Sequence, residues 1–236
     1  MFKGKKYLAI IPARGGSKGL PKKNIKILKD KPLIAWTIEI ALQSKFLDKI
    51  IVSSDDDEII SVAKNYGNIV PFKRPDYLAT DKSTSFSVVE HAIDFLEKNG
   101  ESYDYVVLLE PTSPLRKIDD IDKMIKKIGS SNSSFDAIIS IGEVALHPSS
   151  MKRITKNEFI TNFNKSLKKA TRRQDNEKVF FPFGVAYIVR TDILVKEKTF
   201  YPEKSTYFLI DRYQCFEIDD IYDFIIIEKI IQYEKI

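Results

Sequence analysis

The stretch Tyr7–Asn24, which reads YLAIIPARGGSKGLPKKN, determines how the rest of the chain is interpreted. Its first part, Tyr7–Ile11, is an apolar run with the length of a buried strand. The chain then passes through Pro12, Gly15 and Gly16, which are typical of a turn. The same loop carries long cations at Arg14, Lys18, Lys22 and Lys23. A strand that runs into a glycine-rich cationic loop favours a polyphosphate site, because backbone N–H groups and cations can both approach the anion.

This loop matches neither of the common phosphate-binding motifs. The run GGSKG at 15–19 lacks the spacing of a Walker A loop, and it also lacks the G-x-G-x-x-G pattern of dinucleotide-binding folds. The alternative interpretation is an ordinary surface turn in a lysine-rich protein. Later parts of the chain have to decide between the two.

Composition predicts a single globular domain over residues 1–236, since 43% of the residues are hydrophobic and 30% are charged. The apolar runs are short, so we expect no membrane-spanning segment, and the run at 7–13 is too short for a signal peptide. The single Cys215 excludes an intramolecular disulfide, and with two histidines it argues against structural zinc. A cytoplasmic enzyme is expected.

The net charge of +5 does not by itself indicate nucleic acid. Lysines are spread over the chain without a recognised nucleic-acid motif, so we predict no such partner. Two basic stretches, the opening loop and Lys165–Arg173, would serve a small polyanionic substrate equally well.

Strand-like and helix-like segments alternate, which predicts an α/β fold with a mostly parallel, Rossmann-like sheet and helices on both faces. We predict strands at 7–11, 49–53, 69–72, 105–109, 135–141, 184–189, 207–210 and 216–218. We predict helices at 33–44, 58–66, 83–98, 119–128, 191–195 and 221–233. Four polar loops follow predicted strands, at Arg14–Asn24, Ser53–Asp57, Lys73–Asp76 and Glu110–Arg116. Parallel strands would bring these loops to one edge of the sheet, where ligands bind.

Residues 143–183 interrupt the regular pattern and are basic. The segment offers few obvious core residues of its own, and the exceptions are Ile154, Phe159, Ile160 and Phe163. The segment is either a long surface excursion or an extension that packs on a second subunit, because apolar residues without a cover need a partner.

Three further stretches carry chemistry-bearing residues. Lys73-Arg74-Pro75 precedes the run LATD at 78–81 and Ser83, and PTSPLR at 111–116 holds two prolines in a loop after a core strand. Taken alone, Arg74 reads as a surface cation and PTSPLR as a structural turn. The third stretch is EIDDIYD at 217–223. A strand would place Glu217 and Asp219 on one side, where they could hold a divalent cation; helix capping is the alternative, with Asp220 as the cap and Asp223 complementing the helix dipole.

In this order, these motifs resemble the CMP-N-acetylneuraminate synthetase family, the cytidylyltransferases that activate sialic acid and related nonulosonic acids. The resemblance is carried by IIPARGGSKGLPKKN at 10–24, KPLIAWTIEIALQS at 31–44 and the three stretches above, and it covers roughly residues 7 to 230. It implies a nucleotide-diphospho-sugar transferase fold, transfer of CMP from CTP to a nine-carbon 2-keto sugar acid, and a homodimer formed through the 143–183 extension.

The resemblance also assigns roles to residues. On the nucleotide side it implies Ala13, Arg14, Gly15, Ser17, Lys18, Lys23, Asn24, Arg74 and Ser83. On the sugar-acid side it implies Glu110, Arg173, Gln174 and Tyr187. Arg14, Lys18, Lys23 and Asp219 are the expected catalytic residues, and Glu217 with Asp219 is the expected Mg²⁺ pair.

Three positions depart from the family pattern. Glu110 stands where glutamine is frequent, Glu217 where aspartate is usual, and Phe183 where asparagine is usual. One hypothesis is that Glu110 suits an acceptor with more hydrogen-bond donors or a cationic group. Two alternative functions are another sugar nucleotidyltransferase of the same fold and a non-catalytic nucleotide-binding homologue. The sequence does not choose among N-acetylneuraminate, legionaminate, pseudaminate and their relatives.

Overall fold

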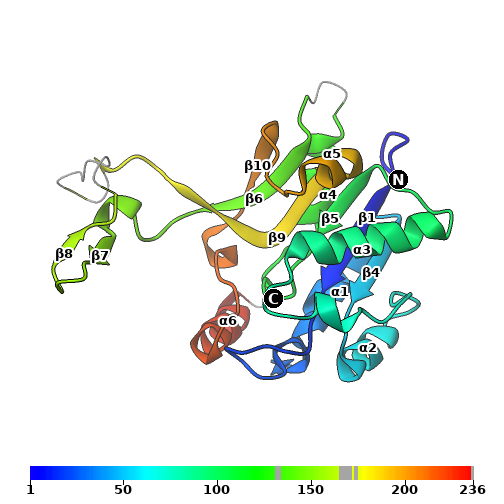
Figure 1. The fold of residues 1–236 in the computed structure, drawn as a ribbon, viewed down its shortest axis with the longest axis horizontal. Helices are drawn as coiled ribbons and strands as arrows, with labels where there is room; N and C mark the ends of the chain where they lie inside the picture. Colours follow the sequence, from blue (N-terminus) through cyan, green and yellow to red (C-terminus); the bar gives the residue numbers. More distant parts are fainter. Residues whose placement is uncertain (131–133, 165–171, 173–174, 235–236) are drawn as a thin grey trace.

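A six-stranded sheet forms the centre of the computed structural model, which describes residues 1–130, 134–164, 172 and 175–234 (Figure 1). The strand order is β10-β6-β9-β5-β1-β4. Strand β9 runs antiparallel to its neighbours β5 and β6, and the other neighbouring pairs are parallel. The strands are β1 (Tyr7–Pro12), β4 (Lys49–Ser53), β5 (Tyr105–Leu108), β6 (Ala137–Glu143), β9 (Phe180–Arg190) and β10 (Ser205–Leu209). The predicted mostly parallel α/β sheet is confirmed.

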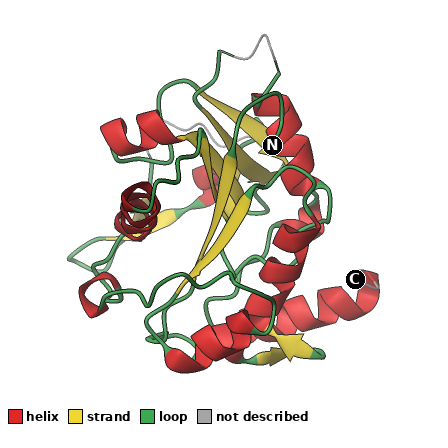
Figure 2. Ribbon diagram, turned by 90° about the vertical axis from the view of Figure 1, so that its right-hand side faces the viewer, coloured by secondary structure: helices red, strands yellow, loops and turns green. Residues whose placement is uncertain are grey.

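Helices cover both faces of this sheet (Figure 2). Tyr7, Ala9 and Ile11 of β1 pack with α1, α2 and α4, whereas Leu8 and Ile10 pack with α3 and α5. This split follows from the alternation of side chains along a strand. The helices are α1 (Leu33–Gln43), α2 (Asp57–Lys64), α3 (Ser85–Lys98), α4 (Asp120–Ile128), α5 (Thr191–Glu197) and α6 (Ile221–Glu234). Short 3-10 turns lie at Lys23–Ile25, Asp76–Leu78, Pro148–Ser150 and Arg212–Gln214.

Helix α6 packs away from the main sheet, beneath the opening loop. Its Phe224 and Ile227 share a buried cluster with Leu20 of that loop and with Trp36 of α1. The short hairpin β2 (Ile27–Leu28) and β3 (Lys31–Pro32) adds Leu28 to the same cluster. The opening loop is therefore anchored by apolar packing on the last helix of the chain.

Two of the predicted strands are wrong. Residues 69–72 are irregular: Ile69 is buried and its carbonyl accepts from Val52 N at 2.7 Å, but Pro71 lacks the N–H that a strand ladder needs. Residues 216–218 are also irregular. There Ile218 is buried, and its N–H is bound by Thr112 O at 2.9 Å, a loop carbonyl rather than a neighbouring strand. In both segments one apolar residue is buried, but the segment does not pair as a strand.

The described parts of residues 143–183 extend away from the body of the protein, which is compatible with both a surface excursion and an extension that packs on a second subunit (Figure 1). Strands β6 and β9 continue their pairing outward to Glu143 and Phe180. Beyond them lies a hairpin of β7 (Lys152–Ile154) and β8 (Ile160–Asn162). Ile154 and Ile160 are 75% and 71% exposed on this hairpin.

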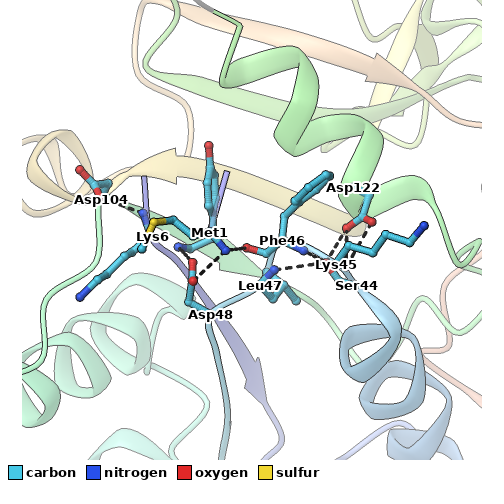
Figure 3. A network of polar contacts seen from close by, with 10 residues as sticks. Met1, Lys6, Ser44, Lys45, Phe46, Leu47, Asp48, Asp104 and Asp122 are labelled. Carbon is cyan, nitrogen blue, oxygen red and sulfur yellow. Dashed lines mark hydrogen bonds and ion pairs between the residues drawn. The ribbon is translucent and has the colours of Figure 1, made fainter. Parts of the chain in front are cut away.

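Buried and half-buried carboxylates close the edge of the sheet where the parallel strands begin (Figure 3). Asp48 accepts from Tyr7 N at 2.8 Å, Asp104 from Lys6 N at 2.9 Å, and Asp122 from Lys45 N at 3.2 Å. The long polar loops that follow β1 and β5 lie at the opposite edge, where these parallel strands end. Among the described residues, no helix combines the length and the apolar character needed to cross a bilayer.

Candidate functional site

A cleft of about 630 Å³ lies at the carboxyl ends of β1 and β5. It is lined by Pro12, Arg14, Ser17, Lys18, Gly19, Lys23, Asn24, Arg74, Leu78, Thr80, Asp81, Ser83, Thr84, Ser85, Val88, Glu110, Pro111, Thr112 and Asp219. Three of the four loops that the sequence placed at one edge contribute to this lining. The fourth, Ser53–Asp57, contacts the opening loop through Asp55, which accepts a hydrogen bond from Gly15 N.

Polar side chains fix the shape of the opening loop. Asn24, which is buried, donates from Nδ2 to Arg14 O at 3.0 Å, and Gly15 N donates to Asp55 Oδ1 at 3.2 Å. Lys22 adopts a left-handed backbone with φ of 53° and pairs with Glu58 at 2.6 Å, outside the cleft. The loop is therefore held by one internal hydrogen bond and by contacts to Asp55 and Glu58, and its Arg14, Lys18 and Lys23 line the cleft.

Two of these cations share one carboxylate that sequence reasoning missed as a site residue. Arg14 Nη1 lies 3.1 Å from Asp81 Oδ1, and Lys18 Nζ pairs with Asp81 Oδ2. The bond from Lys18 holds the pKa of Asp81 below its usual value. The position of Asp81 within the LATD run, two residues before Ser83, was the available signal.

Arg74 is buried, at 3% exposure, and is not the surface cation that the residue taken alone suggests. Its Nε donates to Ser53 Oγ at 3.1 Å, and its Nη2 donates to the Ser53 carbonyl. Burial lowers the pKa of this guanidinium to about 10. The side chain is thus a fixed cation in the cleft wall at the end of β4.

The four other predicted nucleotide residues lie at different depths. Ser17 lines the cleft, as does Ser83, whose Oγ donates to Tyr77 O at 3.1 Å and orders the turn that carries Asp81. Ala13 is fully buried in the main core, and a side chain at Gly15 would strike Asp56 Oδ2 at 2.6 Å. The side-chain positions of Ala13 and Gly15 therefore face the interior, and only the backbone of these two residues could meet a ligand.

The opening loop closes on the start of α6. Lys23, whose side chain is 13% exposed, donates from Nζ to Ile218 O at 2.6 Å and lies 3.3 Å from Asp219 Oδ1. A Cβ at Gly19 would stand 2.3 Å from Asp219 O, so only glycine permits this approach. The opening loop and the acidic stretch 217–223, to which the sequence analysis assigned site residues, therefore lie in contact although they are far apart in the chain.

Capping is divided between neighbouring aspartates at this helix start. Asp220 Oδ1 accepts from Tyr222 N at 2.7 Å and Asp223 N at 3.1 Å, which confirms it as the cap. Asp223 does more than complement the dipole, because its Oδ2 accepts from Asp219 N at 2.9 Å and Asp220 N at 3.1 Å. The Asp219 carboxylate is not used for capping in these bonds and is 84% exposed at the cleft.

Glu110 and Glu217 lie side by side against the backbone of β9. A Cβ at Gly184 would stand 2.5 Å from Glu110 Oε2 and 2.9 Å from Glu217 Oε1. Burial raises the pKa of Glu110 to about 7, and the Glu217 carboxylate adds to the rise. The part of the cleft around Glu110 is therefore a region where negative charge is costly.

Arg116 supports this region from below and was not recognised as important from its motif alone. It is 2% exposed and donates to Val185 O at 2.5 Å, Gly184 O at 2.9 Å, Thr37 Oγ1 at 3.0 Å and Glu110 O at 3.1 Å. Burial lowers its pKa to about 10. Four bonds to three segments make the PTSPLR run a structural brace as well as a cleft wall.

A second cavity of about 260 Å³ shares Glu110 with the main cleft. Tyr187, Phe200 and Tyr201 form its aromatic wall, with ring centroids of Tyr187 and Tyr201 5.9 Å apart. The predicted acceptor residues Glu110 and Tyr187 are thus brought together. The other two, Arg173 and Gln174, lie outside the described residues.

The carboxylates only partly fit a divalent cation. Among the described residues, no three His, Cys, Asp or Glu side chains gather as a metal site. Asp219 is suitably exposed, and Mg²⁺ can be bound by one or two carboxylates together with water and substrate phosphates. Glu217 Oε1 already accepts two hydrogen bonds, from Ser113 Oγ at 2.9 Å and Gly184 N at 2.5 Å.

Comparison with known proteins gives a consistent result. Residues 8–235 match the family described as cytidylyltransferase. A pseudaminic acid cytidylyltransferase of Campylobacter jejuni is 35% identical over 218 residues, 92% of this chain and 93% of that protein. A CMP-N,N'-diacetyllegionaminic acid synthase of Legionella pneumophila is 35% identical over 237 residues, covering 96% and 97%. An N-acylneuraminate cytidylyltransferase of Escherichia coli is 33% identical over 93% of this chain and 50% of its own length.

Solved structures share the fold at lower identity. A CMP:2-keto-3-deoxy-manno-octonic acid synthetase complexed with CTP has a TM-score of 0.69 at 16% identity and covers 97% of this chain and 99% of its own. A 4-diphosphocytidyl-2C-methyl-D-erythritol synthase of Anaerococcus prevotii has a TM-score of 0.67 at 13% identity, with coverage of 98% and 100%.

Two glycines of the opening loop provide a matched test of the closure on Asp219. Gly19→Ala places a methyl group against Asp219 O, whereas a Cβ at Gly16 meets nothing within 4 Å. Both changes reduce the entropy of the unfolded chain alike. We expect Gly19→Ala to lower the free energy of unfolding by about 1–3 kcal/mol relative to Gly16→Ala, as overpacking does. Urea denaturation would measure this, and equal stability of the two variants would contradict the close approach.

Proposed function

The chain belongs to the cytidylyltransferase family, and on that premise we propose that it transfers CMP from CTP to the anomeric hydroxyl of a sialic-acid-like nonulosonic acid, releasing pyrophosphate. The observation that carries the proposal is the convergence of Arg14, Lys18 and Lys23 with Asp219 in one cleft. The names of the relatives favour this function, and no observation favours a different nucleotide or a non-catalytic role. The product would supply activated sugar for surface glycans.

The proposed step is a displacement at the α-phosphorus. The anomeric oxygen forms a bond to that phosphorus, the bond to the bridging oxygen of the β-phosphate breaks, and the hydroxyl proton passes to solvent. Such a transfer depends mainly on positioning and on neutralising charge. Arg14 and Lys18 would bind the triphosphate and the leaving pyrophosphate, with the buried Arg74 and Asn24 on the nucleotide side.

The acceptor would lie toward Glu110 and Tyr187, where the two cavities join. The family resemblance implies that Arg173 and Gln174 act on the same side, and an arginine fork suits an acceptor carboxylate. Since Glu110 introduces a carboxyl group with a raised pKa, it is the position from which we expect acceptor preference to differ among relatives.

We also propose Mg²⁺ as the cofactor, held by Asp219 with water and phosphate oxygens. When bound, the cation would neutralise phosphate charge and could lower the pKa of the attacking hydroxyl. Lys23, next to Asp219, would keep the opening loop in register with this carboxylate.

Pyrophosphate release with a panel of substrates tests the function. Purified protein with Mg²⁺ is incubated with each of the four nucleoside triphosphates, alone and with N-acetylneuraminate, legionaminate, pseudaminate or a sugar phosphate. We expect release only with CTP and a nonulosonic acid. Release with another triphosphate or with a sugar phosphate would sink the proposal, and so would CTP binding without any release. Repeating the panel with Glu110→Gln tests whether this residue sets the preference.

A charge-removal pair tests the role of the opening loop. Lys18 lines the cleft and is 82% exposed, so Lys18→Ala should fold normally. We expect turnover to fall at least about tenfold, from a loss of about 2–4 kcal/mol of transition-state stabilisation. Lys22→Ala is the control, because that lysine pairs with Glu58 outside the cleft. Steady-state kinetics with CTP would measure both, and similar turnover in the two variants would remove the assigned role.

We further propose a homodimer formed through residues 143–183. The support is the exposed apolar surface of the β7–β8 hairpin, where Phe159 and Ile160 are 69% and 71% exposed. Burial of such side chains in a second copy would be favourable at roughly 25 cal/mol per Å² of apolar area.

The single Cys215 and the use of CTP favour the cytoplasm as the site of action, which fractionation of expressing cells would check.

Light scattering after size exclusion tests the dimer. The chain has a mass of 27.2 kDa, and we expect twice that mass in solution. Ile160→Asp should give the monomer mass, because a charge would be buried in the interface. Val195→Asp, at an exposed position of α5, is the control and should stay dimeric. A wild-type protein that elutes as a monomer would refute the proposal.

A further inference from the structure

Glu217 has hydrogen bonds that tie two separate segments together. Its Oε1 accepts from Ser113 Oγ at 2.9 Å, in the loop after β5, and from Gly184 N at 2.5 Å, in β9. An oxygen that accepts two protein donors has less capacity left for a cation. The contacts of Glu217 therefore resemble those of a brace more than those of an open metal ligand.

The peptide groups of Gly184 are held from the other side as well. The Gly184 carbonyl accepts from Arg116 Nη2 at 2.9 Å and from Glu110 N at 3.2 Å. Arg116 is 2% exposed and also binds the Glu110 carbonyl at 3.1 Å. The backbone of β9 at Gly184 is thus fixed between Glu217 on its N–H and Arg116 on its carbonyl.

The side chain of Glu110 packs against this fixed backbone. The missing Cβ of Gly184 leaves room for Glu110 Oε2, which would be 2.5 Å from it. Three residues further along β9, Tyr187 enters the acceptor-side cavity. A shift of β9 would therefore move Tyr187 and change the place of the Glu110 carboxyl.

We propose that Glu217 is a positioning residue, which sets β9 and the Glu110 carboxyl on the acceptor side, and that Asp219 is the carboxylate on which cation binding depends. Asp219 differs from Glu217 in being 84% exposed and in lining the cleft. The terms acceptor and cation here rest on the proposed function. The hydrogen-bond brace itself does not.

Two conservative variants separate bracing from metal binding. Glu217→Gln keeps the length of the side chain and an acceptor oxygen but removes the charge. Glu217→Asp keeps the carboxylate but shortens the arm, so that it can no longer reach Gly184 N and Ser113 Oγ together. Asp219→Asn is the positive control for cation binding. Three quantities are measured: amide hydrogen exchange in the peptide 180–187, binding of Mn²⁺ alone by electron paramagnetic resonance, and KM for the acceptor.

We expect Glu217→Gln to retain protection at Gly184 and Glu217→Asp to exchange there at least about tenfold faster, because its hydrogen bond is lost. Glu217→Asp should also raise the acceptor KM about tenfold with a smaller change in the KM for CTP, since misplaced contacts weaken binding on one side only. The Kd for Mn²⁺ should stay within about twofold of wild type in both Glu217 variants and rise at least about tenfold in Asp219→Asn.

The opposite pattern overturns the inference. If Glu217→Gln weakens Mn²⁺ binding as much as Asp219→Asn does, Glu217 is a metal ligand. If Glu217→Asp keeps wild-type exchange at Gly184, the brace does not position β9. Should Glu217→Asp fail to fold, Glu217→Gln still decides, through its exchange and Mn²⁺ results. If the wild type turns over no acceptor, the proposed function fails, while exchange and Mn²⁺ binding still judge Glu217.

Discussion

The cleft depends on one contact between distant parts of the chain, the closure of the opening loop on the residues before α6. Lys23 Nζ binds Ile218 O across a separation of 195 residues, and Gly19 lies against the carbonyl of Asp219. Beneath them Leu20 packs with Phe224 in a buried cluster. Apolar packing brings the two segments together, and the polar contacts then fix their register, which places the cations of the loop opposite an exposed carboxylate.

The sequence predicted this arrangement to the extent that local pattern and sheet topology determine it. Tyr7–Ile11 could only be a buried strand, and parallel strands bring their following loops to one edge whatever those loops contain. That is why Arg14 and Glu110, which follow β1 and β5, could be placed around one cleft from the sequence. The same reasoning failed at 69–72 and 216–218, because an apolar run reveals burial and not the identity of its hydrogen-bond partners.

The parts that could not be predicted are long-range polar contacts. Taken alone, Arg74 reads as a surface cation and Arg116 as part of a structural turn. Both are almost fully buried, and they donate to main-chain carbonyls of Ser53 and Gly184. Asp81 is one carboxylate among many until Arg14 and Lys18 are seen to share it. A buried arginine is tolerated only where several acceptors converge, and such convergence is a property of the tertiary fold.

These contacts divide the cleft by charge. Cations of the opening loop and Arg74 line one side, whereas Glu110 lies on the other side, beside Glu217. A triphosphate is attracted to the first side and repelled from the second, so the charge pattern alone would orient a nucleotide with its phosphates over the loop. The close carboxylates Glu110 and Glu217 would be unstable without compensation, and the buried Arg116 supplies a positive charge near them. Arg116 thereby stabilises the carboxylates around Glu110 in a cleft that also holds the cations of the opening loop and their partners Asp81 and Asp219.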